Sequence, residues 1–147
     1  MRKSPKSSFW VFFFLVVSLS HTPLLIALDR TQSPKDAAVY FITPQSGDTV
    51  SSSFTVRFGL RNMGVAPAGL IASKTGHHHL LINLERLPNL DEPLPSNANV
   101  RHFGAGQTEV ILKLPRGTHT LQLLLGNHAH VPHQPPVTSK RITVTVQ

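Results

Sequence analysis

The sequence predicts an all-β protein, an antiparallel immunoglobulin-like β-sandwich of about seven strands, and three observations favour this fold. Apolar residues occur in short runs, several of which alternate with polar residues as a half-buried strand does. The segments between the runs are rich in Pro, Gly, Asn and Ser, which favour turns. No stretch keeps a helical period, and short strands with regularly spaced turns are typical of this sandwich.

The alternation of apolar and polar residues is clearest in two of the predicted strands. From Phe54 to Phe58 every second residue is apolar, and the same pattern runs from Ile142 to Val146. Residues that alternate in this way place one face on a core and the other in solvent. In chain order, the predicted strands are 38–42, 53–60, 77–84, 100–103, 108–114, 118–126 and 140–146.

The N-terminal segment predicts export. A basic start, MRKSPKSS, precedes an apolar run from Phe9 to Leu19, and this order is typical of a signal peptide. Cleavage is expected after Ser20 or near Ala27, and an uncleaved membrane anchor stays open as the alternative. The expected location is therefore periplasmic or otherwise exported. The chain divides into a signal peptide or anchor over 1–28, a flexible lead-in over 29–37 and one sandwich domain over 38–147.

The charge and the cysteine content limit the classes of binding partner that we expect. Without Arg2, Lys3 and Lys6, 11 of the 14 basic residues remain against 7 acidic ones, a net charge of +4. These charges are scattered, so nucleic acid is not an expected partner, whereas an envelope protein or an anionic envelope polymer stays possible. Contact with the membrane is expected only if the N-terminal segment stays attached. The chain has no cysteine, so a bound metal would need nitrogen, oxygen or thioether ligands.

Histidines are concentrated in three segments that the predicted fold brings to one end of the sandwich. These are GHHH at 76–79, RHFGAGQTE at 101–109 and GNHAHVPH at 126–133, which carry seven of the nine histidines. In an immunoglobulin-like order they lie at or beside the loops between strands two and three, four and five, and six and seven, which share an end. Side chains two apart on a strand point to the same face, so His77 and His79 point together.

This pattern favours a transition-metal site, with copper before zinc as the bound ion. Imidazole suits both metals, and affinity for divalent ions generally peaks at copper. Met63 is a possible thioether ligand, and the scarcity of nearby carboxylates argues against calcium or magnesium. A site with ordinary histidines would lose its metal as the pH falls through about 6.5. The preferred ligands are His77, His79, His128 and His130, followed by His102 and His133.

A structural role is the competing interpretation for each histidine. Loop histidines are usually surface groups, and buried ones are usually hydrogen-bonded core residues. His119 follows a turn at the start of a strand, where sandwiches place a corner residue bonded to backbone, so it is expected to be structural. His78 points away from His77 and His79, and we expect it to face the core with Leu80.

Several motifs resemble a family of small exported bacterial proteins known only as a domain of unknown function, DUF4399. They are MGVAPAG, GHHHLLI, HFGAGQTE, LPRGTHTLQLLLGNHAHVPHQPPV and the closing ITVTV, and together they cover about residues 38–146. The resemblance implies a periplasmic or exported location of the Gram-negative type, and it transfers no function. One departure is Asn127, where relatives often have Asp. If that acid orients a ligand histidine, an amide would do so less strongly.

The sequence therefore leaves two classes of function open. The first is an exported protein that binds copper or zinc for buffering or delivery. The alternative is a non-enzymatic cell-envelope binding module whose histidines contact a ligand or partner. An enzyme is not favoured, because the chain has no nucleophile elbow, no phosphate-binding glycine loop and no HExxH pair. A metalloenzyme would need a base, for which Glu109 is the one visible candidate.

Overall fold

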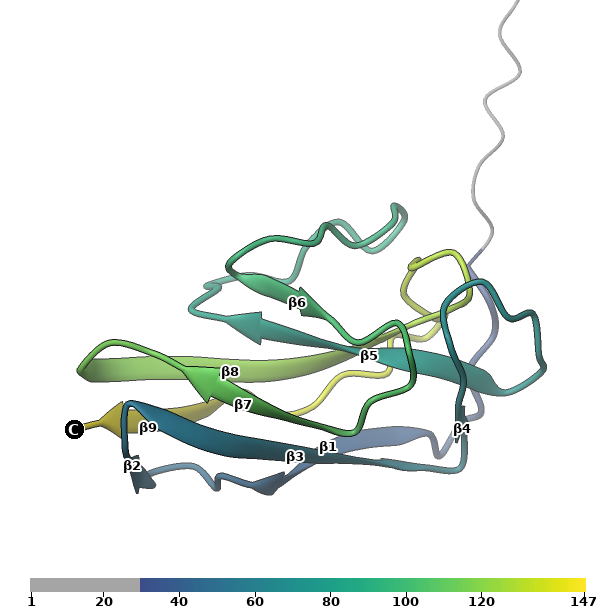
Figure 1. Ribbon diagram of the computed structural model, residues 1–147. Helices are drawn as coiled ribbons and strands as arrows, with labels where there is room; N and C mark the ends of the chain where they lie inside the picture. The colour runs from purple at the N-terminus through teal and green to yellow at the C-terminus, as the bar shows by residue number, and fades with distance from the viewer. Residues whose placement is uncertain (1–29) are drawn as a thin grey trace, which may run out of the picture.

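The computed structural model describes residues 30–147, which form two β-sheets packed face to face without an α-helix (Figure 1). The predicted all-β sandwich is therefore confirmed. The signal peptide or anchor expected over 1–28 lies outside the described residues. Residues 30–147 contain no helix that is long and apolar enough to cross a membrane.

The two sheets differ in size and in strand direction. The smaller is antiparallel, in the order β1 (Ala38–Thr43), β3 (Ser53–Arg61) and β7 (Glu109–Lys113). The larger has the order β2 (Thr49–Val50), β9 (Ile142–Val146), β8 (Gly117–Gly126), β5 (Thr75–Ile82) and β4 (Gly64–Val65), with β6 (Val100–His102) also on β5. The two-residue strands β2 and β4 pair in parallel with β9 and β5, and the other pairs are antiparallel.

All seven predicted strands are present. The fourth of them, β6, differs from the expected order in its pairing, and this pairing forms part of the site. In the order of an immunoglobulin constant domain this strand would lie beside the fifth strand, in the smaller sheet. Here β6 pairs with β5 in the larger sheet instead. Val100 is buried there against Leu81 and Leu124, so β6 covers apolar surface on the outer face of this sheet.

The main core lies between the sheets and follows from the alternation of their strands. Phe54, Val56 and Phe58 of β3 face the interior, while the residues between them are exposed. They pack in one cluster with Leu121 and Leu123 of β8, which are both fully buried. Each such side chain contributes roughly 1.5–3 kcal/mol when it is buried. A chain without disulfides can therefore be stable on this core.

The larger sheet is also covered on its outer face, which distinguishes β5 from the other strands. The segment between β5 and β6 crosses this face and contributes Leu94, which packs with Leu81 of β5 (Figure 1). As a result, every residue of β5 from Gly76 to Ile82 is buried. Side chains on both faces of β5, histidines included, are therefore withdrawn from water.

Residues 30–34, which the sequence suggested as part of a flexible lead-in, are bonded to the sandwich; we name them the N-terminal strap. The backbone of Ser33 donates to Gln134, and the backbone of Gln134 donates to Thr31. Arg30 donates through Nε to the carbonyl of Pro132 at 3.1 Å and through its guanidinium to the carbonyl of His133. The strap thus pairs with the loop after β8 and satisfies backbone groups on it.

Candidate metal centre

Strand β5 places its three consecutive histidines on two opposite faces. His77 and His79 point to the outer face beneath the covering segments, and both are fully buried. His78 points between the sheets, with its ring centroid 4.7 Å from that of Phe58. The expectation that His78 faces the core is therefore confirmed. The prediction that His77 and His79 point to the same face is confirmed as well, because their ring centroids lie 4.8 Å apart.

His102 joins this pair through strand pairing. Residues His79 and His102 are direct partners in the β5–β6 register, and their ring centroids lie 5.1 Å apart. The rings of His77 and His102 are 4.9 Å apart. One ring nitrogen from each of these three histidines lies within 4.8 Å of the other two. A tetrahedral ion with bonds of about 2.0–2.1 Å holds its ligand nitrogens about 3.3 Å apart, so small side-chain movements suffice to share one ion.

His130 reaches the same place from the loop after β8. Its ring centroid is 4.6 Å from that of His102 and 5.0 Å from that of His77, but 6.1 Å from that of His79. The loop is tied to the covering segment by a backbone hydrogen bond of 3.0 Å from Leu94 to the carbonyl of His130. Four imidazole rings therefore gather at one end of the larger sheet, and we name them the histidine cluster.

The turn that presents His130 is organised by Asn127. Its side-chain oxygen accepts hydrogen bonds from the backbone of Ala129 at 2.9 Å and of Val131 at 3.0 Å. Its own carbonyl accepts a 2.9 Å bond from the backbone of His130. These bonds hold His130 at a φ of 68°, which residues other than glycine rarely adopt. The sequence suggested that residue 127 could orient a ligand ring. The side-chain amide of Asn127 holds the backbone of the turn instead.

Glycines provide the room that the rings occupy. A Cβ atom on Gly126 would lie 2.8 Å from Cε1 of His79, and one on Gly104 would clash with the ring of His102. On Gly76 it would lie 2.7 Å from Nε2 of His133. None of these glycines has a positive φ, so close approach of the imidazoles is the reason for glycine at these positions.

The rings of the cluster lack the hydrogen bonds that buried imidazoles normally make. Both ring nitrogens of His77 and His79 are buried without a partner, as is Nε2 of His102. His119 provides the contrast, because its Nε2 donates to the carbonyl of Pro115 at 2.8 Å and its Nδ1 accepts from Asn83 at 2.9 Å. The structural role expected for His119 is thus confirmed. Each unsatisfied buried group lowers the free energy of unfolding by about 1–3 kcal/mol, so the unpaired nitrogens of the cluster destabilise the metal-free fold.

Burial favours the neutral form of three of the clustered histidines, His77, His79 and His102. It lowers the pKa of His77 from 6.5 to about 4, and the nearby rings of His102 and His130 lower it further. The pKa of His79 is lowered more strongly, again mainly by burial, while the backbone of His77 opposes the shift without forming a well-aligned hydrogen bond. Burial also lowers the pKa of His102. Neutral imidazole is the form that binds a metal, so His77 is ready to bind well below pH 6.5.

The remaining predicted ligands lie near the cluster without joining the group of three. His128 is in the same turn as His130, and its carbonyl accepts a 2.9 Å bond from the backbone of Gly69. His133 is buried, with Nδ1 3.3 Å from the carbonyl of Thr31 in the N-terminal strap, and its Nε2 has no partner. Burial lowers the pKa of His133. The three histidine segments thus meet at one end of the sandwich, as the sequence predicted.

Two other sequence candidates lie away from the cluster. Met63 packs against the core between the sheets, so its thioether is directed to apolar contacts. Glu109 is exposed on the smaller sheet and accepts a 2.9 Å hydrogen bond from Nε of Arg57. Within residues 30–147, the side chains gathered as one possible metal-binding group are histidines alone.

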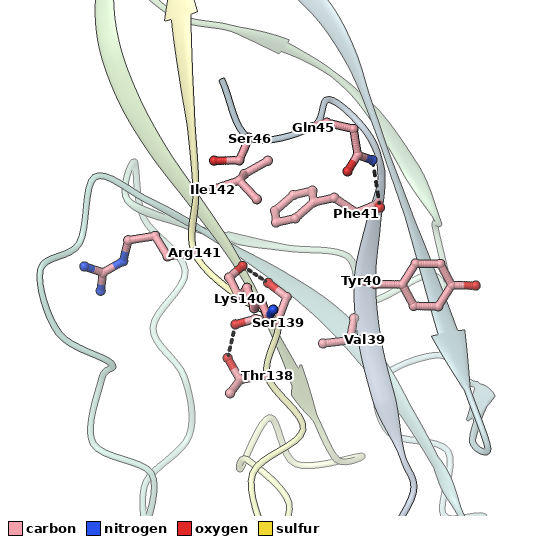
Figure 2. Close-up of a pocket in the computed structure, with 10 residues that line it drawn as sticks. All are labelled: Val39, Tyr40, Phe41, Gln45, Ser46, Thr138, Ser139, Lys140, Arg141 and Ile142. Carbon is pink, nitrogen blue, oxygen red and sulfur yellow. Dashed lines mark hydrogen bonds between the residues drawn. The ribbon is translucent and has the colours of Figure 1, made fainter. Parts of the chain in front are cut away.

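A pocket of about 610 Å³ lies elsewhere, between β1 and the segment that leads into β9 (Figure 2). Its apolar floor includes Phe41 and Ile142, which point toward each other. Polar groups at its edge already have partners, since the side-chain amide of Gln45 donates to the carbonyl of Phe41, and Ser139 Oγ donates to the carbonyl of Lys140. The pocket therefore lacks the unsatisfied polar groups that mark the histidine cluster.

Sequence reasoning overlooked the residues that build the site without contributing a ring to it. Gly126, Gly104 and Thr31 are of this kind, and the role of Asn127 in shaping the turn was also missed. A Gly-Asn pair after an apolar run is a turn signal, so the turn itself was visible. The approach of the glycines to particular rings was not, because it depends on contacts between segments distant in the chain.

The fold and the site define a class of protein: a small all-β sandwich with buried, unpaired imidazoles gathered at one end. The chain belongs to the family described as Domain of unknown function (DUF4399), whose sequence model matches residues 56–147. This confirms the resemblance found in the motifs. Neither the curated proteins nor the solved structures include a significant match to the chain.

Proposed function

We propose that this protein binds one transition-metal ion, copper before zinc, at the histidine cluster, with His77, His79 and His102 as ligands. The observation that carries the proposal is the set of buried ring nitrogens without hydrogen-bond partners on these three converging side chains. A metal ion removes the cost of leaving those nitrogens unsatisfied, because it bonds directly to their lone pairs. His78 also lacks partners, but it faces the apolar core beside Phe58, whereas the nitrogens of the three ligands converge within 4.8 Å of one another.

The donor set supports copper or zinc over other ions. Imidazole nitrogen is a good ligand for both, whereas calcium and magnesium require several oxygen ligands. No sulfur ligand is gathered at the cluster among the described residues, because the chain has no cysteine and Met63 packs in the core. Copper precedes zinc because divalent affinity for a given nitrogen site generally peaks at copper.

The biological role we propose is buffering or delivery of the ion in the cell envelope. The basic and apolar N-terminal segment supports export to the periplasm or beyond. Partial exposure of His102 and His130 supports exchange of the ion with the surroundings, because a fully enclosed site would release it slowly. An envelope protein that receives the ion is the partner of such a role.

The test compares matched variants of β5 in metal titrations. Protein is prepared without an immobilised-metal column, freed of metal with a chelator, and titrated with copper or zinc against a competing chromophoric chelator. We expect one ion per chain in the wild type and a loss of about 10-fold or more in affinity for His77→Ala with His79→Ala. His78→Leu is the matched control, because it changes the histidine between them on the opposite face and should keep the affinity.

Melting curves give a second readout on the same proteins. Metal that binds only the native state raises its stability by roughly 2.7 kcal/mol at a hundredfold excess over the dissociation constant. The rise should vanish in the double variant and persist in His78→Leu. If wild-type protein takes up neither copper nor zinc, the proposal is wrong, and the alternative of an envelope-binding module without metal takes its place.

A further inference from the structure

We propose that the metal held at the histidine cluster carries an exchangeable small anion as an additional ligand, and that His130 lies beside this ligand as its hydrogen-bond partner. The inference rests on the proposed function, and it assigns a second binding step to the same site. The chemical class of the ligand is a small monovalent anion such as azide, a halide or a carboxylate.

The geometry of the four rings gives the first argument. His77, His79 and His102 form a nearly regular triangle, with centroid separations of 4.8, 4.9 and 5.1 Å. His130 is not equidistant from them, because its centroid is 6.1 Å from that of His79 and only 4.6 Å from that of His102. Three protein ligands leave a four-coordinate ion with one further position. His130 lies beside the triangle, closest to His102 and farthest from His79.

The backbone explains why His130 does not simply move into the fourth position. The residue is held at a φ of 68° by the turn around Asn127. Its carbonyl is anchored by the backbone of Leu94. A shift of the whole residue would break these bonds, so the backbone keeps His130 beside the triangle.

Charge gives the second argument. An imidazole binds a metal in its neutral form, and the described side chains gathered here include no carboxylate. Two acids elsewhere on the described surface are already paired with arginines, Asp91 with Arg30 and Glu109 with Arg57. A divalent ion would therefore keep its double positive charge in a largely buried place, where an unpaired charge is costly. An anion at the free position reduces that cost.

Burial shows where the ligand enters. His77 and His79 are fully buried, whereas His102 and His130 are only partly buried. The accessible side of the cluster is thus the side where His130 lies. A small anion reaches the ion from there, and a ring nitrogen of His130 is the polar group available to hydrogen-bond it.

The experiment titrates the copper-loaded protein with sodium azide at constant ionic strength. Copper stoichiometry is measured first, so that a protein that holds no copper reveals a failure of the proposed function before azide is added. Azide bound to copper(II) gives a charge-transfer absorption band, which we expect to saturate at one azide per copper. His130→Ala should keep copper and bind azide about tenfold more weakly. His128→Ala, a change in the same turn, should alter neither affinity.

Two results would overturn the inference while leaving the metal site intact. One is a copper-loaded wild type that shows no azide band and no change in its electron paramagnetic resonance spectrum, which would mean a closed site. The other is a loss of copper in His130→Ala as severe as in His77→Ala, which would make His130 a fourth ligand. The wild-type titration alone is decisive if the His130 variant does not fold.

Discussion

His79 and His102 are direct partners in the β5–β6 register, with their ring centroids 5.1 Å apart on the outer face of the larger sheet. Strand pairing fixes their backbones, so the two rings do not depend on a mobile loop for their approach. Gly126 on one side and Gly104 on the other leave the space that the rings fill. This relationship leads to predictions that separate the site from the fold around it.

Gly126→Ala should disturb the site more than the sandwich. The added Cβ would lie 2.8 Å from Cε1 of His79, so the ring must leave its position. We expect metal affinity to fall about tenfold or more. The matched control is Gly64→Ala in β4, whose Cβ would meet only Thr75 Cγ2 at 3.4 Å. Competition titrations measure both, and equal affinities in the two variants would contradict the prediction.

The metal-free protein should lose stability as the pH falls from about 6.5 toward 4. Burial lowers the folded-state pKa of His77 to about 4, so between the two pH values the unfolded chain binds a proton that the folded chain does not. Stability is therefore complete above the unfolded pKa and decreases below it, by about 1.4 kcal/mol per pH unit for each such histidine. Urea unfolding at several pH values measures this slope.

His77→Ala with His79→Ala supplies the control for that pH dependence. The slope should be smaller in the double variant, because two of the groups that gain protons only on unfolding have been removed. An unchanged slope would assign the acid sensitivity to other residues. In the wild type, metal binding should persist at pH 5, below the loss near pH 6.5 expected from unperturbed histidines, because His77, with its pKa lowered to about 4, is mostly neutral there.

His78→Leu should stabilise the metal-free fold. Both ring nitrogens of His78 are buried without partners in an apolar core, beside Phe58. Burial lowers its pKa to about 4, while the backbone of Gln107 opposes the shift. Replacing an unsatisfied polar ring with an apolar side chain should raise the free energy of unfolding by about 1 kcal/mol. Chemical denaturation measures the change, and a loss of similar size would show that His78 makes a bond that stabilises the core.

Removal of the N-terminal strap should loosen the site. A chain that begins at Lys35 loses two acceptors on Thr31: its hydroxyl, which accepts from the side chain of Asn127 at 2.8 Å, and its carbonyl, which accepts from His133 Nδ1. We expect faster hydrogen exchange at the backbone of Val131 and release of metal several-fold faster, about as for other losses of supporting bonds. Asp91→Asn is the control, because it removes only the exposed partner of Arg30. Identical exchange and release rates in the truncated and full chains would count against the strap.

Cell fractionation tests the proposed export. We expect the protein outside the cytoplasm, shortened by about 20–28 residues if the signal is cleaved. Cleavage at either expected position leaves Arg30 and the strap attached to the sandwich. Mass spectrometry of the exported protein measures the cut, and full-length protein in the soluble cytoplasm would refute the proposal.

Much of the fold was readable from local pattern. The alternation from Phe54 to Phe58 and from Ile142 to Val146 gave strands whose buried and exposed residues match it. The separation of His77 and His79 from His78 followed from the twofold period of a strand, and the corner role of His119 followed from the turn before it. These features depend on residues close in the chain, where backbone geometry alone sets the direction of a side chain.

Only the tertiary structure decided which histidines form one site. The partnership of His79 with His102 required β6 to pair with β5, and the offset of His130 required the turn around Asn127. The burial that keeps the rings neutral comes from Leu94 and the segment around it, which show no regular pattern in sequence. The sequence determined which residues can act as ligands, because that is a property of side-chain chemistry. Their distances, burial and charge were decided by contacts between distant segments, which no local pattern encodes.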